Sequence, residues 1–168
     1  MAKSDSFFIR AKAEFNGTTF TQTSVDLGAY VDALGKSVLR IHNISVQWGA
    51  PLEDADTSTT NAGQTNGFQL TTQSQSGMVD ITDKSIIASG RLSLHTDASA
   101  AVTQINDYLD VGPQDWTAGY LVGVEQIYLG VNSSSAANLD LSQCAIMLEC
   151  TVETLSQSAA MALALSQQ

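Results

Sequence analysis

Apolar and polar residues alternate over two long stretches of this chain, which is the pattern of a β-strand with one buried face. Between residues 7 and 15 the odd positions are apolar, and Arg10, Lys12 and Glu14 lie between them. The stretch from residue 143 to residue 153 is more regular still. Its inward positions are Cys144, Ile146, Leu148, Cys150 and Val152. Each stretch predicts a half-buried strand whose polar side faces water.

A third strand is predicted over residues 38–48, and its alternation changes phase once. The two apolar residues before residue 42 are at odd-numbered positions, and the three apolar residues after residue 43 are at even-numbered positions. In chain order they are Leu39, Ile41, Ile44, Val46 and Trp48. A one-residue slip turns every later side chain to the opposite face unless the strand accommodates an extra residue. We therefore expect a β-bulge or a sharp bend at His42–Asn43, with Trp48 in the core.

Turn-forming residues divide the rest of the chain. Asn16-Gly17 is typical of a hairpin turn, and it predicts that the first strand pairs with the β-branched run 18–23. Residues 50–67 are rich in Pro, Asp, Thr and Gly, and predict a long loop of the kind that often carries function. A turn is predicted at residues 112–115. Further strands are predicted over residues 68–70, 85–95, 104–109 and 121–131, the last of them apolar on both faces and therefore central.

The end of the chain has a different character. Residues 155–168 hold Ala, Leu and Met without a β-branched residue, which favours a short helix. Such a helix is marginal alone in water, so it must dock on another surface. The predicted strands number about eight and do not alternate with helices. The sequence therefore predicts an all-β, antiparallel two-sheet sandwich of the single jelly-roll type over residues 1–155, followed by a helical tail over residues 156–168.

The charge is distributed unevenly along the chain. The formal net charge is −10, and no lysine or arginine follows Arg91, although eight of the 17 acidic residues do. A half-chain without a cation cannot hold phosphate groups through Lys or Arg, and it repels polyanions. We therefore expect no direct binding of nucleic acid.

No residue pattern indicates an enzyme. The two histidines, His42 and His95, belong to no metal-binding motif, and a joint metal site would need the fold to bring them together. The chain has no G-x-S-x-G turn and no glycine-rich phosphate loop. Cys144 and Cys150 share one strand face about 20 Å apart, too far for a disulfide, so two buried thiols are expected. We expect neither catalysis nor a cofactor.

Two groups of side chains are candidates for binding. Glu53, Asp54 and Asp56 form the one dense acidic group, and their carboxylates could hold Ca²⁺. The spacing of a calcium loop is absent, however, so a solvated turn is the simpler interpretation. Trp116, in the turn-rich segment 112–119, is the one aromatic residue that we expect to reach the surface. Together with Tyr120 it is a candidate for surface recognition.

Two segments, VLRIHNISVQW (residues 38–48) and CAIMLEC (residues 144–150), look like framework strands of a viral coat protein. Over about residues 7–155 the chain resembles the single jelly-roll capsid proteins of tailless icosahedral viruses, including those that enclose a membrane and double-stranded DNA. The resemblance implies a structural subunit that self-assembles into capsomers and an icosahedral shell. It also implies that the protein is located in the virion after synthesis in the host cytoplasm. No signal peptide is expected, because the sequence shows no apolar segment of the length that a signal peptide needs.

The chain departs from many RNA-packaging coats of this kind at its beginning. Those proteins carry a basic N-terminal arm, whereas Lys3 is the only basic residue among the first six residues here. The resemblance therefore implies that an inner membrane layer or a second coat protein faces the genome.

Assembly requires contacts between copies of the chain. We expect neighbouring sandwiches to pack side by side in a ring-closing manner. The tail is expected to dock as a helix on an adjacent subunit through Met161, Leu163 and Leu165, and folding back on its own sandwich is the alternative. The net charge of −10 opposes such packing, so salt, divalent cations or a basic partner should promote it.

A different class of protein also fits the pattern. A carbohydrate-binding or adhesin-type β-sandwich would use Trp116, Tyr120 and the loop over residues 50–67 as its binding face. Sugar binding by a monomer would favour this alternative. Concentration-dependent assembly that is lost without the tail would favour a coat protein.

Overall fold

The computed structural model describes residues 3–32, 36–55, 59–134 and 141–168. Within these residues it contains nine strands, a 3₁₀ helix and an α-helix. In chain order they are β1 (Phe7–Glu14), β2 (Thr21–Asp26), β3 (Ser37–Trp48), β4 (Gly63–Thr71), β5 (Ile86–Thr96), β6 (Val102–Val111), η1 (Pro113–Asp115), β7 (Tyr120–Val122), β8 (Gln126–Ser133), β9 (Gln143–Thr154) and α1 (Gln157–Ser166).

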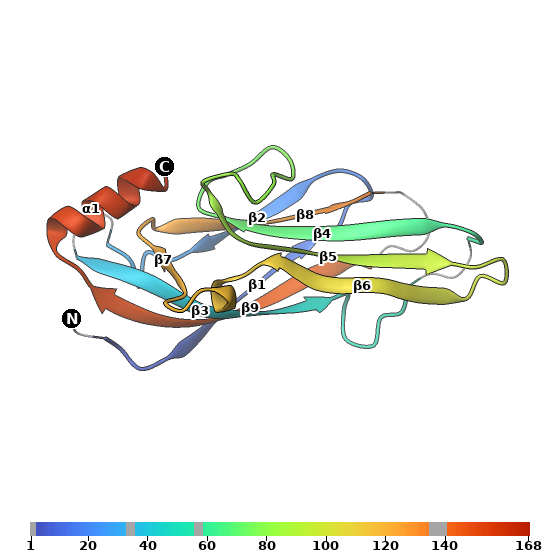
Figure 1. Ribbon diagram of the computed structural model, residues 1–168, viewed down its shortest axis with the longest axis horizontal. Helices are drawn as coiled ribbons and strands as arrows, with labels where there is room; N and C mark the ends of the chain where they lie inside the picture. The colour runs from blue at the N-terminus through green and yellow to red at the C-terminus, as the bar shows by residue number, and fades with distance from the viewer. Residues whose placement is uncertain (1–2, 33–35, 56–58, 135–140) are drawn as a thin grey trace.

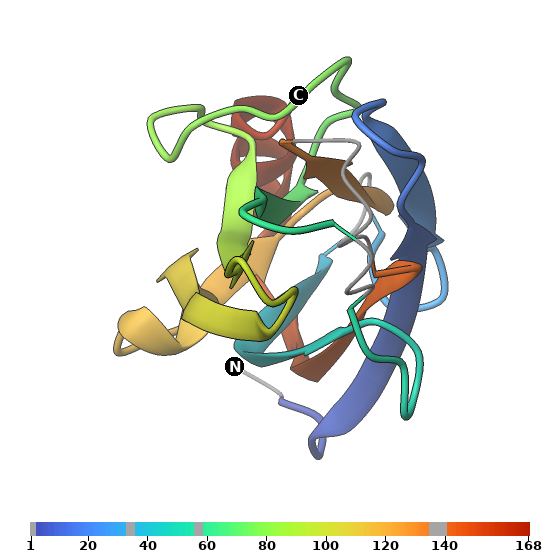
Figure 2. The ribbon, with the colours of Figure 1, turned by 90° about the vertical axis from the view of Figure 1, so that its right-hand side faces the viewer.

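The strands form two antiparallel sheets packed as a sandwich (Figures 1 and 2). One sheet has the order β1-β9-β3-β7, and the other has the order β2-β8-β4-β5-β6. The chain crosses between the sheets after β1, β2, β3, β6, β7 and β8. With β6 counted as an added edge strand, this is the predicted jelly roll. As a consequence, most strand pairs join segments that are far apart in sequence, such as β1 and β9.

The core lies between the sheets and is built by the inward residues of both. Burial alternates along β1 and over most of β9, as the sequence predicts. Phe68 on β4 is fully buried and makes an edge-on contact with Trp48, with 5.8 Å between the ring centroids. Trp48 packs against the core as expected, and its Nε1 donates to Asp107 Oδ1 at 3.1 Å. Other fully buried side chains include Leu27, Leu39, Ile41, Leu70, Ile87, Ile127, Leu129 and Leu148.

Two expectations for single strands are confirmed. The register between β3 and β9 shifts between Ile41 and Asn43, which is the predicted bulge. Because of this shift, apolar residues on both halves of β3 face the core. Cys144 and Cys150 on β9 are buried free thiols, and burial raises the pKa of each to about 12.

The hairpin predicted at Asn16-Gly17 is wrong. The turn itself forms, because Thr19 N donates to Asn16 O at 3.0 Å and Gly17 has φ +53°. However, β1 pairs with β9 and β2 pairs with β8, so the two strands lie in different sheets. The turn therefore carries the chain across the sandwich instead of along one sheet.

The single strand predicted over residues 121–131 is also wrong. Its first part is β7 in the four-stranded sheet, and its second part is β8 in the five-stranded sheet. Most of β8 is buried, whereas β7 is an edge strand in which only Val122 is buried. The loop predicted over residues 50–67 ends earlier than expected, because β4 begins at Gly63 and pairs there with β5.

The tail forms α1, which packs against one end of its own sandwich (Figure 1). Gln167, only 5% exposed, fixes it in place: its Nε2 donates to Leu121 O at 2.7 Å, and its Oε1 accepts from Gly123 N at 2.8 Å. Thr72 Oγ1 also donates to Gln167 O at 2.9 Å. Folding back, the alternative that the sequence left open, is therefore the observed position, and only the outward side of α1 remains for a neighbour. No helix of the described residues combines the length and apolar character that crossing a membrane requires.

Candidate functional site

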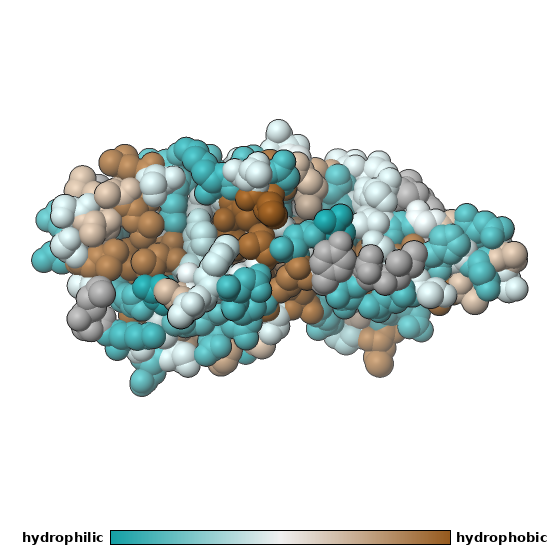
Figure 3. All heavy atoms as spheres, in the orientation of Figure 1, coloured by the Kyte–Doolittle hydropathy of each residue, from teal (hydrophilic) through white to brown (hydrophobic). Residues whose placement is uncertain are grey.

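Residues 159–165 of the helix α1 are all Ala, Met or Leu, and the helix carries no charged residue. Ala160 and Ala164 face the sandwich and are buried, whereas Met161 is 42% and Leu165 is 68% exposed. Figure 3 shows apolar side chains gathered over α1 and the neighbouring β7. A helix with this composition normally lies in a protein interior. One side of α1 is thus an apolar surface that the single chain leaves open to water.

Two aromatic residues lie beside this helix. Trp116 is 41% exposed, and its ring centroid lies 5.9 Å from that of Tyr120, with the rings tilted by 42°. Tyr120 is half-buried, and this burial raises the pKa of its phenol. With Leu163 and Gln167, both rings line an open depression of about 490 Å³. We call Trp116, Tyr120, Met161, Leu163 and Leu165 the end patch.

The segment that carries the aromatic residues is held against β3. Gly119 N donates to Trp116 O at 3.0 Å, which closes a turn before Tyr120. Arg40 Nη1 donates to Ala118 O, so β3 holds the turn in place. Gly119 has φ +64°, and a Cβ there would lie 2.3 Å from Ile41 O. The turn can approach β3 this closely only because residue 119 has no side chain.

Replacing Gly119 with alanine is expected to lower the free energy of unfolding by more than about 2 kcal/mol. The variant combines a left-handed backbone conformation with a clash against the Ile41 carbonyl. Urea denaturation followed by fluorescence would measure the loss. Gly77→Ala is the matched control, because nothing lies within 4 Å of a Cβ at Gly77. Equal losses in the two variants would contradict the assigned role of Gly119.

The end patch unites two sets of residues that the sequence indicates separately. Trp116 and Tyr120 are predicted as recognition residues, and Leu163 is predicted as an interface anchor, yet all three line the same depression. Met161 and Leu165 lie on the exposed side of the same helix. Trp116 reaches the surface as expected, although Phe8 and Tyr30 are exposed as well.

Sequence reasoning missed the residues that build the patch. Gln167 looks like an ordinary polar residue near the end of a tail, and Gly119 looks like one of many loop glycines. Gly119 depends on its close contact with β3, and Gln167 depends on its hydrogen bond to the segment between β7 and β8. No local sequence pattern indicates such partners.

The acidic group of the long loop has a different place. Glu53 accepts hydrogen bonds from Ala50 N at 2.6 Å and from Ser142 Oγ at 2.8 Å, and the bond from Ala50 contributes most to the lowered pKa of its carboxyl. Its oxygens thus join two loops. Asp54 is exposed, and Asp56 lies outside the described residues. Within the described parts of the chain, no three His, Cys, Asp or Glu side chains lie close enough together to hold a metal ion.

The two histidines lie in different sheets. His42 is on β3 and its Nε2 is 2.9 Å from Thr151 Oγ1, whereas His95 is exposed on β5. The fold does not unite them in a shared site.

Comparison with known proteins finds no match among protein-family models or curated proteins. One solved structure that matches is that of a candidate glycoside hydrolase from Bacteroides thetaiotaomicron, with 9% sequence identity and a TM-score of 0.29. The match covers 81% of this chain and 41% of that chain, so this chain spans less than half the length of the matched protein. At this TM-score the likeness carries no conclusion about function.

Proposed function

We propose that this protein is a self-assembling structural subunit, of the kind that builds a viral capsid from jelly-roll copies. The observation that carries the proposal is the open side of α1. An uncharged helix with Leu165 68% exposed and Met161 42% exposed presents apolar surface to water, and covering this surface with a second copy would stabilise the assembly.

The surroundings of the helix support the same role. Trp116 and Tyr120 extend the apolar surface beyond α1, and aromatic residues are enriched at the centres of protein interfaces. The patch lies at one end of the sandwich, where it can meet another subunit without disturbing either sheet. Because the depression that adjoins it is open and shallow, a helix or loop of a neighbouring copy would fill it better than a small molecule would.

The carbohydrate-binding alternative is less well supported at this place. A platform for stacking sugar rings needs aromatic faces that are exposed and nearly coplanar. Trp116 and Tyr120 are tilted by 42° to each other, and Tyr120 is half-buried.

We expect the double variant Met161→Ser/Leu165→Ser to raise the protein concentration needed for assembly by at least about tenfold. Light scattering and negative-stain microscopy over a range of protein and salt concentrations would measure this change. The wild-type chain should form rings, sheets or shells, and salt should favour them because it screens the net charge of −10.

The matched control is Ala159→Ser/Ala162→Ser, which changes two other exposed positions of α1 and lowers helix propensity at least as much. This control should assemble like the wild type, and all three proteins should have similar circular dichroism. A wild-type chain that stays monomeric under every condition contradicts the proposal. So does assembly of the Met161→Ser/Leu165→Ser variant at the wild-type concentration.

A further inference from the structure

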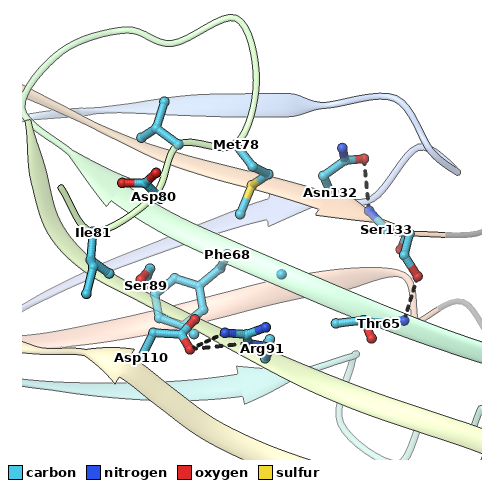
Figure 4. Close-up of a pocket in the computed structure, with 14 residues that line it drawn as sticks. Thr65, Phe68, Met78, Asp80, Ile81, Ser89, Arg91, Asp110, Asn132 and Ser133 are labelled. Carbon is cyan, nitrogen blue, oxygen red and sulfur yellow. Dashed lines mark hydrogen bonds and ion pairs between the residues drawn. The ribbon is translucent and has the colours of Figure 1, made fainter. Parts of the chain in front are cut away.

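A second hollow lies on the outer face of the five-stranded sheet, away from the end patch (Figure 4). Its volume is about 480 Å³. The floor is formed by β4 and β5, which the end of β8 and the end of β6 flank on opposite sides, and the segment 78–81 forms a wall above it. The lining residues used below are Gly67, Met78, Ile81, Arg91, Asp110 and Asn132.

The strand beneath the hollow has no side chain at Gly67, and Met78 lies close to this position. Gly67 is on the outward side of β4, where its register partners are Arg91 on β5 and Asn132 on β8. A Cβ at Gly67 would lie 3.2 Å from the terminal methyl carbon of Met78. A larger residue at position 67 would therefore displace the Met78 side chain and fill part of the hollow.

The wall that carries Met78 is fixed to the sheet by a buried glutamine. Gln69 is fully buried on the same strand as Gly67, and its Nε2 donates to Gly77 O at 3.0 Å. Its Oε1 accepts from Val79 N at 2.8 Å, so one side chain holds the backbone on both sides of Met78. The loop before this wall is held as well, because Gln75 N donates to Gln22 Oε1 at 3.1 Å. Such tethering reduces the entropy that a ligand would lose on ordering the wall.

The lining of the hollow combines apolar and polar groups. Met78 and Ile81 form an apolar rim and are 41% and 60% exposed. On the β5–β6 flank of the floor, Arg91 Nη2 donates to Asp110 Oδ1 at 2.6 Å, which places a planar donor group beside a carboxylate. Asn132 uses its Oδ1 to accept from Ser133 N, and its Nδ2 has no partner among the described residues.

We propose that this hollow binds a neutral sugar. A pyranose ring has an apolar C–H face and a rim of hydroxyl groups that both donate and accept hydrogen bonds. The C–H face fits against Met78 and Ile81, and the hydroxyl groups find donors and acceptors in Arg91, Asp110 and Asn132. The charged residues of the lining are Asp80, Arg91 and Asp110, so acids outnumber bases and the site disfavours an anion.

The test is a titration of the ¹⁵N-labelled full chain with glucose, galactose, mannose and N-acetylglucosamine, followed by amide chemical shifts. At least one sugar should bind with a dissociation constant of about 1 mM, and the shifts should concentrate on residues 65–67, 89–91 and 132–134. Lactose and maltose form a second arm. Tighter binding of a disaccharide assigns the site to a glycan, and tighter binding of the free monosaccharide assigns it to a small molecule.

Gly67→Val fills the floor with a residue that suits a strand and should raise the dissociation constant at least about tenfold. Thr103→Val, an exposed change on β6 outside the hollow, should leave it unchanged. Ile81→Ser removes half of the apolar rim from an exposed position and should also weaken binding.

Three results would overturn the inference. One is the absence of a saturable shift with every neutral sugar at about 100 mM. Another is binding that Gly67→Val leaves intact while its spectrum shows a folded protein. The third is tighter binding of glucuronate than of glucose, which would assign the hollow to anions.

Discussion

Replacing Phe68 with alanine is expected to lower the free energy of unfolding by about 3–5 kcal/mol. Phe68 is fully buried on β4, which lies between β8 and β5 in the middle of its sheet. Its ring contacts Trp48 of the opposite sheet edge-on, so the substitution leaves a cavity between the sheets and removes an aromatic pair. Equilibrium denaturation in urea would measure the change.

Phe8→Ala is the control, because it deletes the same side chain at a position that is 51% exposed. Phe8 is on the outward side of β1, where its ring lies 5.9 Å from the guanidinium carbon of Arg10. We expect a loss of less than about 1 kcal/mol from this variant. Similar losses from Phe8→Ala and Phe68→Ala would mean that β4 does not lie at the centre of the core.

Replacing Arg40 with methionine is expected to cost about 3 kcal/mol of unfolding free energy. Arg40 Nε donates to Glu153 Oε1 at 2.7 Å, and Arg40 Nη2 donates to Glu153 Oε2 at 2.8 Å. The two side chains are only 17% and 9% exposed, so removing the guanidinium leaves a carboxylate poorly solvated and without its main partner. The double variant Arg40→Met/Glu153→Met should lose less than Arg40→Met alone, and denaturation of all three proteins would test this order.

The same ion pair predicts how the loss of unfolding free energy in Arg40→Met depends on pH. The hydrogen bond from Arg40 lowers the pKa of the Glu153 carboxyl below its usual 4.5, because this bond and the Coulomb attraction to Arg40 together outweigh the opposing effect of burial. A carboxyl whose pKa is lower in the folded state stabilises the fold above its unfolded pKa, and this contribution is lost as the pH falls through the folded pKa. The difference between wild type and Arg40→Met should therefore be constant above about pH 5.5 and shrink on acidification below about pH 4.5. A difference that does not change with pH would contradict the assignment.

The regular strands show which features local pattern alone can predict. On β1, and on β9 as far as Cys150, a period of two separates inward from outward residues as the alternation predicts. The prediction fails at the end of β9, where Thr151 and Glu153 are buried and Val152 is half-buried. The bulge on β3 is predicted equally well, because a change of phase in an otherwise apolar strand has few other physical explanations. The two buried thiols follow from the same alternation.

Pairing is where local pattern fails. Asn16-Gly17 forms its turn, but a turn does not specify whether the next strand joins the same sheet or the other one. Residues 121–131 are apolar throughout, and this hides a break that sends the chain from one sheet to the other. At that break, Gly123 lies under α1, where a Cβ would come within 3.0 Å of Leu163 Cγ. The contact joins two segments distant in sequence, so neither segment alone reveals it.

The end patch illustrates the same limit for function. Its five residues come from the turn after η1, from β7 and from the tail. The sequence indicates Trp116 and Tyr120 as recognition residues and Met161, Leu163 and Leu165 as anchors of a helical tail. Only the hydrogen bonds of Gln167 and the contact of Gly119 with β3 bring them to one end of the molecule. The hollow beside Gly67 had no sequence signal at all, since its walls come from four strands and a loop.

The sequence by itself determined the fold class, the inward and outward faces of the long strands, the bulge, the free thiols and the helical tail. These features depend on residues within one turn or one strand, and periodicity and intrinsic propensity describe them. The tertiary structure alone decided which strands pair, where the tail docks and which surfaces stay open. Those features depend on contacts between residues that are distant along the chain. Many arrangements of the strands satisfy the same local pattern, and only the packing of side chains into one shared core selects among them.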